Sequence, residues 1–265
     1  MSSKLTLSYC VAADAEALAD RAARHFTEQI ESAVAARGVA RVAISGGSTP
    51  KAAFQRMAAP ALPWRERIPW QALELFWVDE RAVPPDHAES NYRMTREALL
   101  DQVSIPASHI HRIEGELEPE AAADCYESDL RNSFRLEGAE MPRFDLIALG
   151  MGDDGHTASI FPHTAAIYEL GRLAVANYVP QKESWRITLT WPVINQARSI
   201  FFLLGGAEKA ERVREVFLGP RDVERLPSQL ICPAGGILNL ILDQAAAAYL
   251  PATNGKDCGV LERER

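Results

Sequence analysis

Short apolar stretches alternate along the chain with longer segments in which apolar residues recur at helical spacing. The first long segment, 13–36, has Leu18, Phe26 and Ile30 on one helical face and is followed by Gly38, a residue type that commonly ends helices. The same criteria predict further helices at 50–57, 92–100, 118–134, 208–217 and 238–249. They predict strands at 5–11, 39–44, 73–78, 144–149, 173–178, 186–190 and 200–204.

Strands that alternate with helices are typical of the α/β class. We therefore expect one domain over 1–250, with a mostly parallel, doubly wound (Rossmann-like) sheet and helices on both faces. Prolines and charges at 59–69 and 84–89 indicate loops within that domain. Residues 251–265 are polar and lack apolar periodicity, so we expect a flexible tail that frays.

Composition and charge narrow the possible partners. A formal net charge of −8 argues against non-specific nucleic-acid binding, which depends on lysine and arginine neutralising phosphates. No apolar run approaches the roughly 20 residues that span a bilayer, and the N-terminus has no signal-peptide pattern, so we expect a cytoplasmic protein without a membrane partner. The four cysteines, Cys10, Cys125, Cys232 and Cys258, have no metal-binding spacing, so we expect reduced thiols and no metal site.

Polar and glycine-rich segments follow four of the predicted strands. Ligands of open α/β sheets bind outside the carboxyl ends of the strands, so these segments are expected to face one crevice. Each segment alone is a weak signal, and their convergence is what favours a site. They comprise Ser45, Gly46, Gly47, Ser48 and Thr49; Asp79, Glu80 and Arg81 with Ser90 and Asn91; Gly150 to His156; and Gly205 to Lys209.

The segment 144–162 combines an apolar strand, a glycine-rich turn, two carboxylates and a histidine. Its histidine, His156, can take and return a proton near neutral pH if the end of a strand holds it rigidly. The glycine spacing also matches the dinucleotide-binding pattern. Asp153 and Asp154 would however oppose a pyrophosphate, and Pro162 interrupts the helix that should follow. We therefore expect no nicotinamide cofactor, and no cofactor of another kind.

At these residues the chain resembles the 6-phosphogluconolactonase family. The resemblance covers most of 39–250, and its most specific block is Gly-Met-Gly-x-Asp-Gly-His-Thr-Ala-Ser-x-Phe-Pro, at 150–162. It implies an enzyme that hydrolyses 6-phosphogluconolactone to 6-phosphogluconate in the oxidative pentose phosphate pathway. It leaves monomer and homodimer both open.

The resemblance also implies roles for single residues. His156 would activate a water as general base, and Asp154 would orient the imidazole or its loop. The turn formed by Gly46, Gly47, Ser48 and Thr49 would hold the phosphate of the substrate. Further binding residues implied in the same way are Asp79, Arg81, Asn91, Gly152, Arg186 and Lys209.

Two other functions remain open at this point. The related glucosamine-6-phosphate deaminases typically have tyrosine where this chain has Arg81, and glutamate where it has Phe161. A sugar-phosphate sensor would keep the pocket without catalysis. The sensor is disfavoured because it would not need a general base such as His156.

Overall fold

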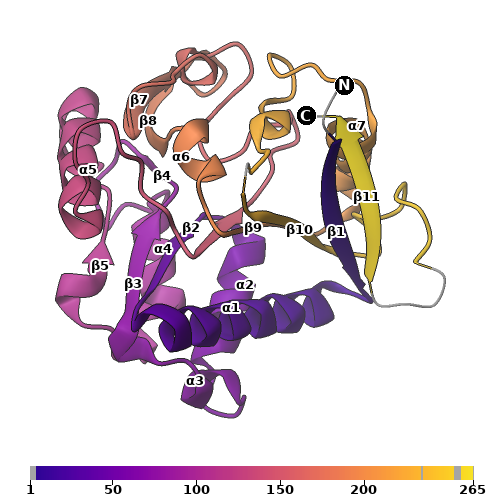
Figure 1. Ribbon diagram of the computed structural model, residues 1–265, viewed down its shortest axis with the longest axis horizontal. Helices are drawn as coiled ribbons and strands as arrows, with labels where there is room; N and C mark the ends of the chain where they lie inside the picture. Colours follow the sequence, from indigo (N-terminus) through magenta and orange to yellow (C-terminus); the bar gives the residue numbers. More distant parts are fainter. Residues whose placement is uncertain (1–3, 234, 254–257, 265) are drawn as a thin grey trace.

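The computed structural model describes residues 4–233, 235–253 and 258–264. Its strands form two sheets (Figure 1). The large sheet contains β1 (Lys4–Ala12), β2 (Ala40–Ile44), β3 (Leu73–Trp77), β5 (Ile110–His111), β6 (Leu146–Leu149), β9 (Ser199–Leu204), β10 (Ile237–Asp243) and β11 (Cys258–Glu264). The small antiparallel sheet contains β4 (Asp79–Arg81), β7 (Ala174–Val179) and β8 (Ser184–Leu189), in the order β4-β8-β7.

The large sheet has eight strands in the order β11-β1-β10-β9-β6-β2-β3-β5. Every neighbouring pair is parallel except β11 and β1, which are antiparallel. The predicted, mostly parallel sheet is therefore confirmed. Because β4 starts two residues after β3 ends, the small sheet continues from the carboxyl end of the large one.

Helices cover both faces of the large sheet, as predicted. In β9, where all six residues are buried, Phe201 contacts Phe26 of α1, whereas the next residue, Phe202, contacts Phe217 of α7. Successive side chains of a strand point to opposite faces, so these two helices lie on opposite sides. The helices are α1 (Ala15–Arg37), α2 (Ser48–Ala58), α3 (Trp64–Arg67), α4 (Asn91–Ala98), α5 (Pro119–Phe134), α6 (Trp191–Asn195) and α7 (Ala210–Leu218).

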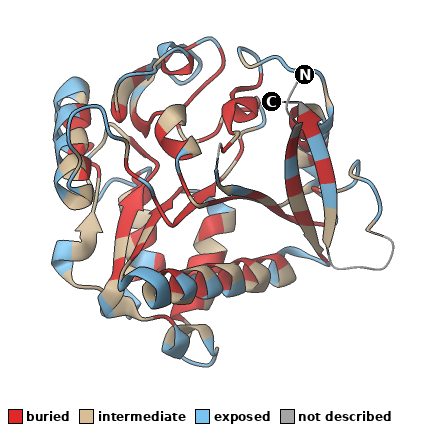
Figure 2. Cartoon of the chain, in the orientation of Figure 1, coloured by how far each residue is buried: buried red, intermediate tan, exposed pale blue. Residues whose placement is uncertain are grey.

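Burial follows this layering. Buried residues are concentrated in the central strands and on the helix sides that face them (Figure 2). Helix α1 shows why the sequence folds this way: the Asp14 carboxylate accepts the backbone N–H of Ala17 at its start, and Gly38 ends it with a φ of 77°. In the part of the chain that the structure describes, no helix is both long and apolar enough to cross a membrane.

The helix expected at 238–249 is wrong, because this segment begins as strand β10. Leu238, Leu240 and Leu242 are buried, and β10 pairs in parallel with β1 on one side and β9 on the other. A short apolar run that is buried on both faces reads equally well as a helix or a strand, so its pattern alone could not decide. The strand ends at Asp243, whose carboxylate accepts the backbone N–H of Ala246 at 2.7 Å.

The expected tail also differs from the structure, because 258–264 form the edge strand β11. Residues 254–257 and 265 of that tail lie outside the described part of the chain. The charged residues of β11 obscured the apolar pattern that predicts a strand, although charged side chains are common on edge strands. One buried residue, Leu261, packs into the core cluster.

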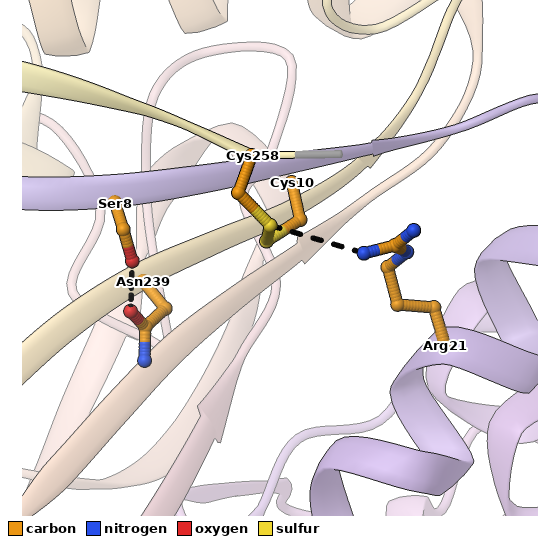
Figure 3. The surroundings of a disulfide bond; sticks show 5 residues. All are labelled: Ser8, Cys10, Arg21, Asn239 and Cys258. Atoms are coloured by element: carbon orange, nitrogen blue, oxygen red, sulfur yellow. Dashed lines mark hydrogen bonds between the residues drawn. A yellow bond between two sulfur atoms is a disulfide. The ribbon is translucent and has the colours of Figure 1, made fainter. Parts of the chain in front are cut away.

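Two of the four cysteines are bonded, contrary to the expectation of reduced thiols. Cys10 of β1 and Cys258 of β11 are direct cross-strand partners with Cα atoms 4.1 Å apart, and they form a disulfide (Figure 3). Arg21 of α1 points toward this bond, with its Nη1 atom 3.9 Å from Cys258 Sγ. The residues are 248 positions apart in sequence, so only the strand register brings them together.

Candidate active site

A polar cavity of about 200 Å³ lies at the carboxyl edge of the large sheet. All four segments that follow the predicted strands contribute to it, so the expectation of one shared crevice is confirmed. The residues that line it are Ser45, Gly46, Gly47, Ser48, Thr49, Pro50, Asp79, Arg81, Asn91, Gly150, Met151, Gly152, His156, Ala158, Leu203, Leu204, Gly205 and Lys209.

His156 is held on two sides. Its Nδ1 atom lies 2.5 Å from Oδ1 of Asp154, and its ring stacks on Phe161 with centroids 3.8 Å apart and planes 20° apart. The backbone N–H of His156 also donates to Asp154 Oδ1, at 3.1 Å. A carboxylate at Nδ1 favours the tautomer with a proton there, which leaves Nε2 as the nitrogen that can accept a proton.

The Asp154 carboxylate is ionised in this arrangement. Burial alone would raise the pKa of Asp154, but the hydrogen bonds and the charge interaction with His156 outweigh it and lower the pKa below its ordinary value of 3.8. A charged carboxylate at Nδ1 also stabilises an imidazolium when one forms. The pair is therefore suited to proton transfer.

Gly152 allows the imidazole to sit where it does. A Cβ atom at this position would lie 2.1 Å from His156 Nδ1 and 2.7 Å from Asp154 Oδ1, distances that real contacts do not reach. The backbone N–H of Gly152 donates to the carbonyl of His156 at 2.9 Å and closes the turn. The glycine is thus required by the close approach of the histidine–aspartate pair.

The turn before α2 offers backbone N–H groups to an anion. Gly47 is the N-cap residue with a φ of 112°, and no side chain caps the helix. The first N–H groups of a helix and the positive end of its dipole favour a phosphate or carboxylate group. Asn91 packs against this turn so closely that a Cβ atom on Gly46 would lie 1.8 Å from its Oδ1.

Glu80 belongs to one of the predicted segments, but the sequence did not reveal its structural role. Its buried carboxylate accepts the backbone N–H groups of Arg81, Asn91 and Tyr92 at 2.7–2.8 Å and the hydroxyl of Ser90 at 3.0 Å. Burial raises the pKa of Glu80, and these donors oppose the shift. Glu80 thereby ties β4 to the start of α4. The only sequence signal for this role was the position of Glu80, ten residues before Ser90, where the helix begins.

Asp79 and Asn91 are fixed next to each other. The Asp79 carboxylate accepts the Ser159 hydroxyl at 2.6 Å, and the side-chain amide of Asn91 donates to the Asp79 carbonyl at 2.9 Å. Both residues are buried, yet both line the cavity. They are therefore rigid polar groups with which a bound molecule can form hydrogen bonds.

Two of the three predicted cations line the cavity. Arg81 donates to the Glu89 carbonyl at 2.5 Å, and Lys209 forms an ion pair with Asp153 of the glycine turn. Arg186 does not line the cavity but is the cross-strand partner of Arg81. Burial lowers the pKa of Arg186, and the positive charge of Arg81 lowers it further. Two arginines side by side favour an anion in their vicinity.

Metal ligands do not gather in this cavity. Within 4–233, 235–253 and 258–264, no group of three or more histidine, cysteine, aspartate or glutamate side chains is arranged to hold a metal ion. The functional groups at the cavity are the histidine–aspartate pair, the Asp79 carboxylate, two cations and a helix N-terminus.

The fold and the cavity define a class: an α/β protein with a histidine–aspartate pair and an uncapped helix N-terminus at the carboxyl edge of a mostly parallel sheet. The family model described as glucosamine-6-phosphate isomerases/6-phosphogluconolactonase matches residues 13–239, and the chain belongs to this family.

Curated relatives and solved structures agree with this assignment. The chain is 42% identical over 236 residues to a 6-phosphogluconolactonase of Synechocystis sp., covering 88% of this chain and 95% of the relative. It is 39% identical over 211 residues to that of Haemophilus influenzae, covering 79% and 87%. The 6-phosphogluconolactonase structure from Trypanosoma brucei superposes with a TM-score of 0.81 at 29% identity, covering 93% of this chain and all of that one.

A monomeric glucosamine-6-phosphate deaminase shares the fold, with a TM-score of 0.74 at 21% identity and coverage of 91% of this chain.

Proposed function

We propose that this protein hydrolyses 6-phosphoglucono-1,5-lactone to 6-phosphogluconate in the oxidative pentose phosphate pathway. The observation that supports the proposal most is the His156–Asp154 pair, placed in one cavity with the uncapped start of α2. The similarity to 6-phosphogluconolactonases over most of the chain supports it independently.

In the proposed mechanism, His156 Nε2 removes a proton from a water molecule, and the hydroxide attacks the lactone carbonyl carbon. The tetrahedral intermediate collapses when the imidazolium returns the proton to the ring oxygen, which leaves as a hydroxyl. Asp154 fixes the tautomer and stabilises the imidazolium. No covalent enzyme intermediate is needed.

The phosphate of the substrate would bind to cationic and backbone N–H groups of the same cavity. We assign it to the turn at 46–49 with Arg81 and Lys209, and Arg186 adds positive charge behind Arg81. Lys209 would exchange its contact with Asp153 for the phosphate. Asp79, Asn91 and Gly152 would contact the sugar ring.

A deaminase function is less well supported. The deaminases that the chain resembles typically have a glutamate at the position of Phe161, and here the phenyl ring stacks directly on the imidazole. No carboxylate can reach the histidine from that position. The ordered His156–Asp154 contact likewise favours an enzyme over a sensor.

A cytoplasmic location and a monomeric or homodimeric state complete the proposal. In a reducing cytosol the Cys10–Cys258 disulfide would be open, because glutathione and thioredoxin keep thiols reduced there.

The test is to generate 6-phosphogluconolactone in situ and to compare its disappearance with spontaneous hydrolysis. We expect acceleration by the purified protein, unchanged after chelator treatment, and no release of ammonia from glucosamine 6-phosphate. A rate equal to the spontaneous one refutes the proposed function. Loss of activity in chelator that a divalent ion restores refutes the mechanism.

A further inference from the structure

A second polar cavity, of about 350 Å³, is lined by residues at the end of α7 and on β11. Figure 1 shows these two elements next to each other. The cavity lies away from the carboxyl edge, because its residue Arg263 pairs with Leu5 near the start of β1. It shares no lining residue with the candidate active site. Its lining combines apolar and cationic groups. The residues are Phe217, Leu218, Gly219, Pro220, Arg221, Gln229, Glu262 and Arg263.

Arg263 is the unusual residue of this cavity, because it is 92% buried without an ion-pair partner among the described residues. Its guanidinium donates to the carbonyls of Val216, Gln229 and Ile231, and its Cζ lies 5.8 Å from the centre of the Phe217 ring. The Nε atom is buried and has no hydrogen-bond partner. Besides the carbonyl dipoles, Cys232 interacts with this charge, and a buried charge without a carboxylate partner is costly.

Arg221 brings a second positive charge to the same cavity. Its Nη1 donates to the Gln229 carbonyl at 3.2 Å, so both guanidinium groups converge on one oxygen. Burial lowers the pKa of Arg263 to about 10; the interaction with Cys232 opposes this shift, and the charge of Arg221 adds to it. Arg263 therefore remains charged at neutral pH. One carboxylate, the exposed Glu262, also lines the cavity, so the cations outnumber it.

The loop that presents Arg221 is well ordered. The side chain of Gln229 accepts the backbone N–H of Asp222 at 2.6 Å and donates to the carbonyls of Glu215 and Pro220. The buried amide therefore fixes the loop from inside. A preformed pair of guanidinium groups over an apolar floor needs little reorganisation to bind an anion.

We propose that this cavity is a second anion site, which binds a phosphate group, either as inorganic phosphate or as the phosphate of a small monoester. Arginine presents paired N–H donors that match phosphate oxygens, and two guanidinium groups balance a dianion. The cavity volume leaves room for a small organic moiety against the exposed side chain of Leu218. This inference is independent of the reaction proposed for the other cavity.

The experiment is calorimetric titration of inorganic phosphate into the full chain with the Lys209→Ala substitution, which weakens the competing site. Arg221→Gln in this background should weaken binding at least tenfold, whereas Arg225→Gln should leave it unchanged. Arg225 is the matched control because it is an exposed arginine on the same loop, paired with Glu215 and Asp222 outside the cavity. Arg221 is chosen over Arg263 because it is exposed and its loss should not disturb folding.

Titrations with glycerol 3-phosphate and acetate complete the test. If glycerol 3-phosphate binds more tightly than inorganic phosphate, and the Arg221→Gln substitution removes this difference, the ligand is an organic phosphate. Equal affinities identify phosphate itself. Equal binding of phosphate by the Arg221→Gln and Arg225→Gln proteins overturns the proposal, and so does acetate binding as strong as that of phosphate.

Discussion

Replacing Gly152 by alanine should disable catalysis while leaving the fold intact. The new methyl group would lie 2.1 Å from Nδ1 and 2.2 Å from Cε1 of His156, whereas normal contacts begin above 3.0 Å. The imidazole must then move by about 1 Å or more, and a displacement of that size costs roughly 10²-fold in rate when it affects a positioned catalytic group. The backbone of Gly152 is not in the left-handed region, so alanine adds no conformational strain there.

The assay is steady-state hydrolysis of lactone generated in situ, with circular dichroism and Tm to verify folding. We expect kcat to fall about 100-fold, because the added methyl group displaces the imidazole. Gly171→Ala is the control, since its added Cβ would be 3.6 Å from the nearest atom. A folded Gly152→Ala protein with kcat within threefold of the parent would show that the His156 position is not critical.

Three other predictions follow from the same structure. Lys209→Ala should lower kcat/KM for the phosphorylated lactone by roughly 10–100-fold, because one charge-assisted contact contributes about 1.5–3 kcal/mol, and should hardly affect kcat/KM for glucono-δ-lactone. Equal losses on both lactones would show that Lys209 does not bind the phosphate. Cys258→Ser should lower the Tm by roughly 10–20 °C, because closing the loop between Cys10 and Cys258 reduces the entropy of the unfolded chain by the equivalent of about 5 kcal/mol. Cys125→Ser removes an exposed free thiol and should leave the Tm unchanged, so equal Tm values for the two variants would contradict this prediction. Because the pKa of Asp154 is lowered, its ionised form stabilises the fold above pH 3.8. The difference in the free energy of unfolding between the parent and Asp154→Asn, measured by urea titration, should therefore shrink below that pH, and a difference that grows there would be inconsistent with the contact to His156.

Much of the site could be predicted from the sequence because a parallel sheet collects its carboxyl ends at one edge. His156, Lys209 and the turn before α2 are far apart in the chain, but each follows an apolar strand, and that is sufficient to bring them together. The glycine positions were also informative, because glycine allows the backbone and side chains to approach each other closely.

The features that could not be predicted depend on register and burial between distant segments. The Cys10–Cys258 pair exists because β11 aligns antiparallel with β1, and no local pattern encodes that alignment. The same alignment puts Arg263 beneath α7 and buries it. The role of Glu80 could not be predicted either, because its partners are backbone N–H groups of a helix start that follows a loop. The strand β10 was misassigned because its apolar residues lack a polar face that would reveal its periodicity.

The most direct test of the general-base role of His156 is the rate of lactone hydrolysis by the His156→Ala protein. We expect a protein that is folded by circular dichroism and whose kcat is lower by about 10²–10⁴-fold, the usual contribution of a positioned general base. A folded His156→Ala protein that keeps near-normal kcat would contradict it, because the histidine would then serve only to pack the glycine turn against Phe161.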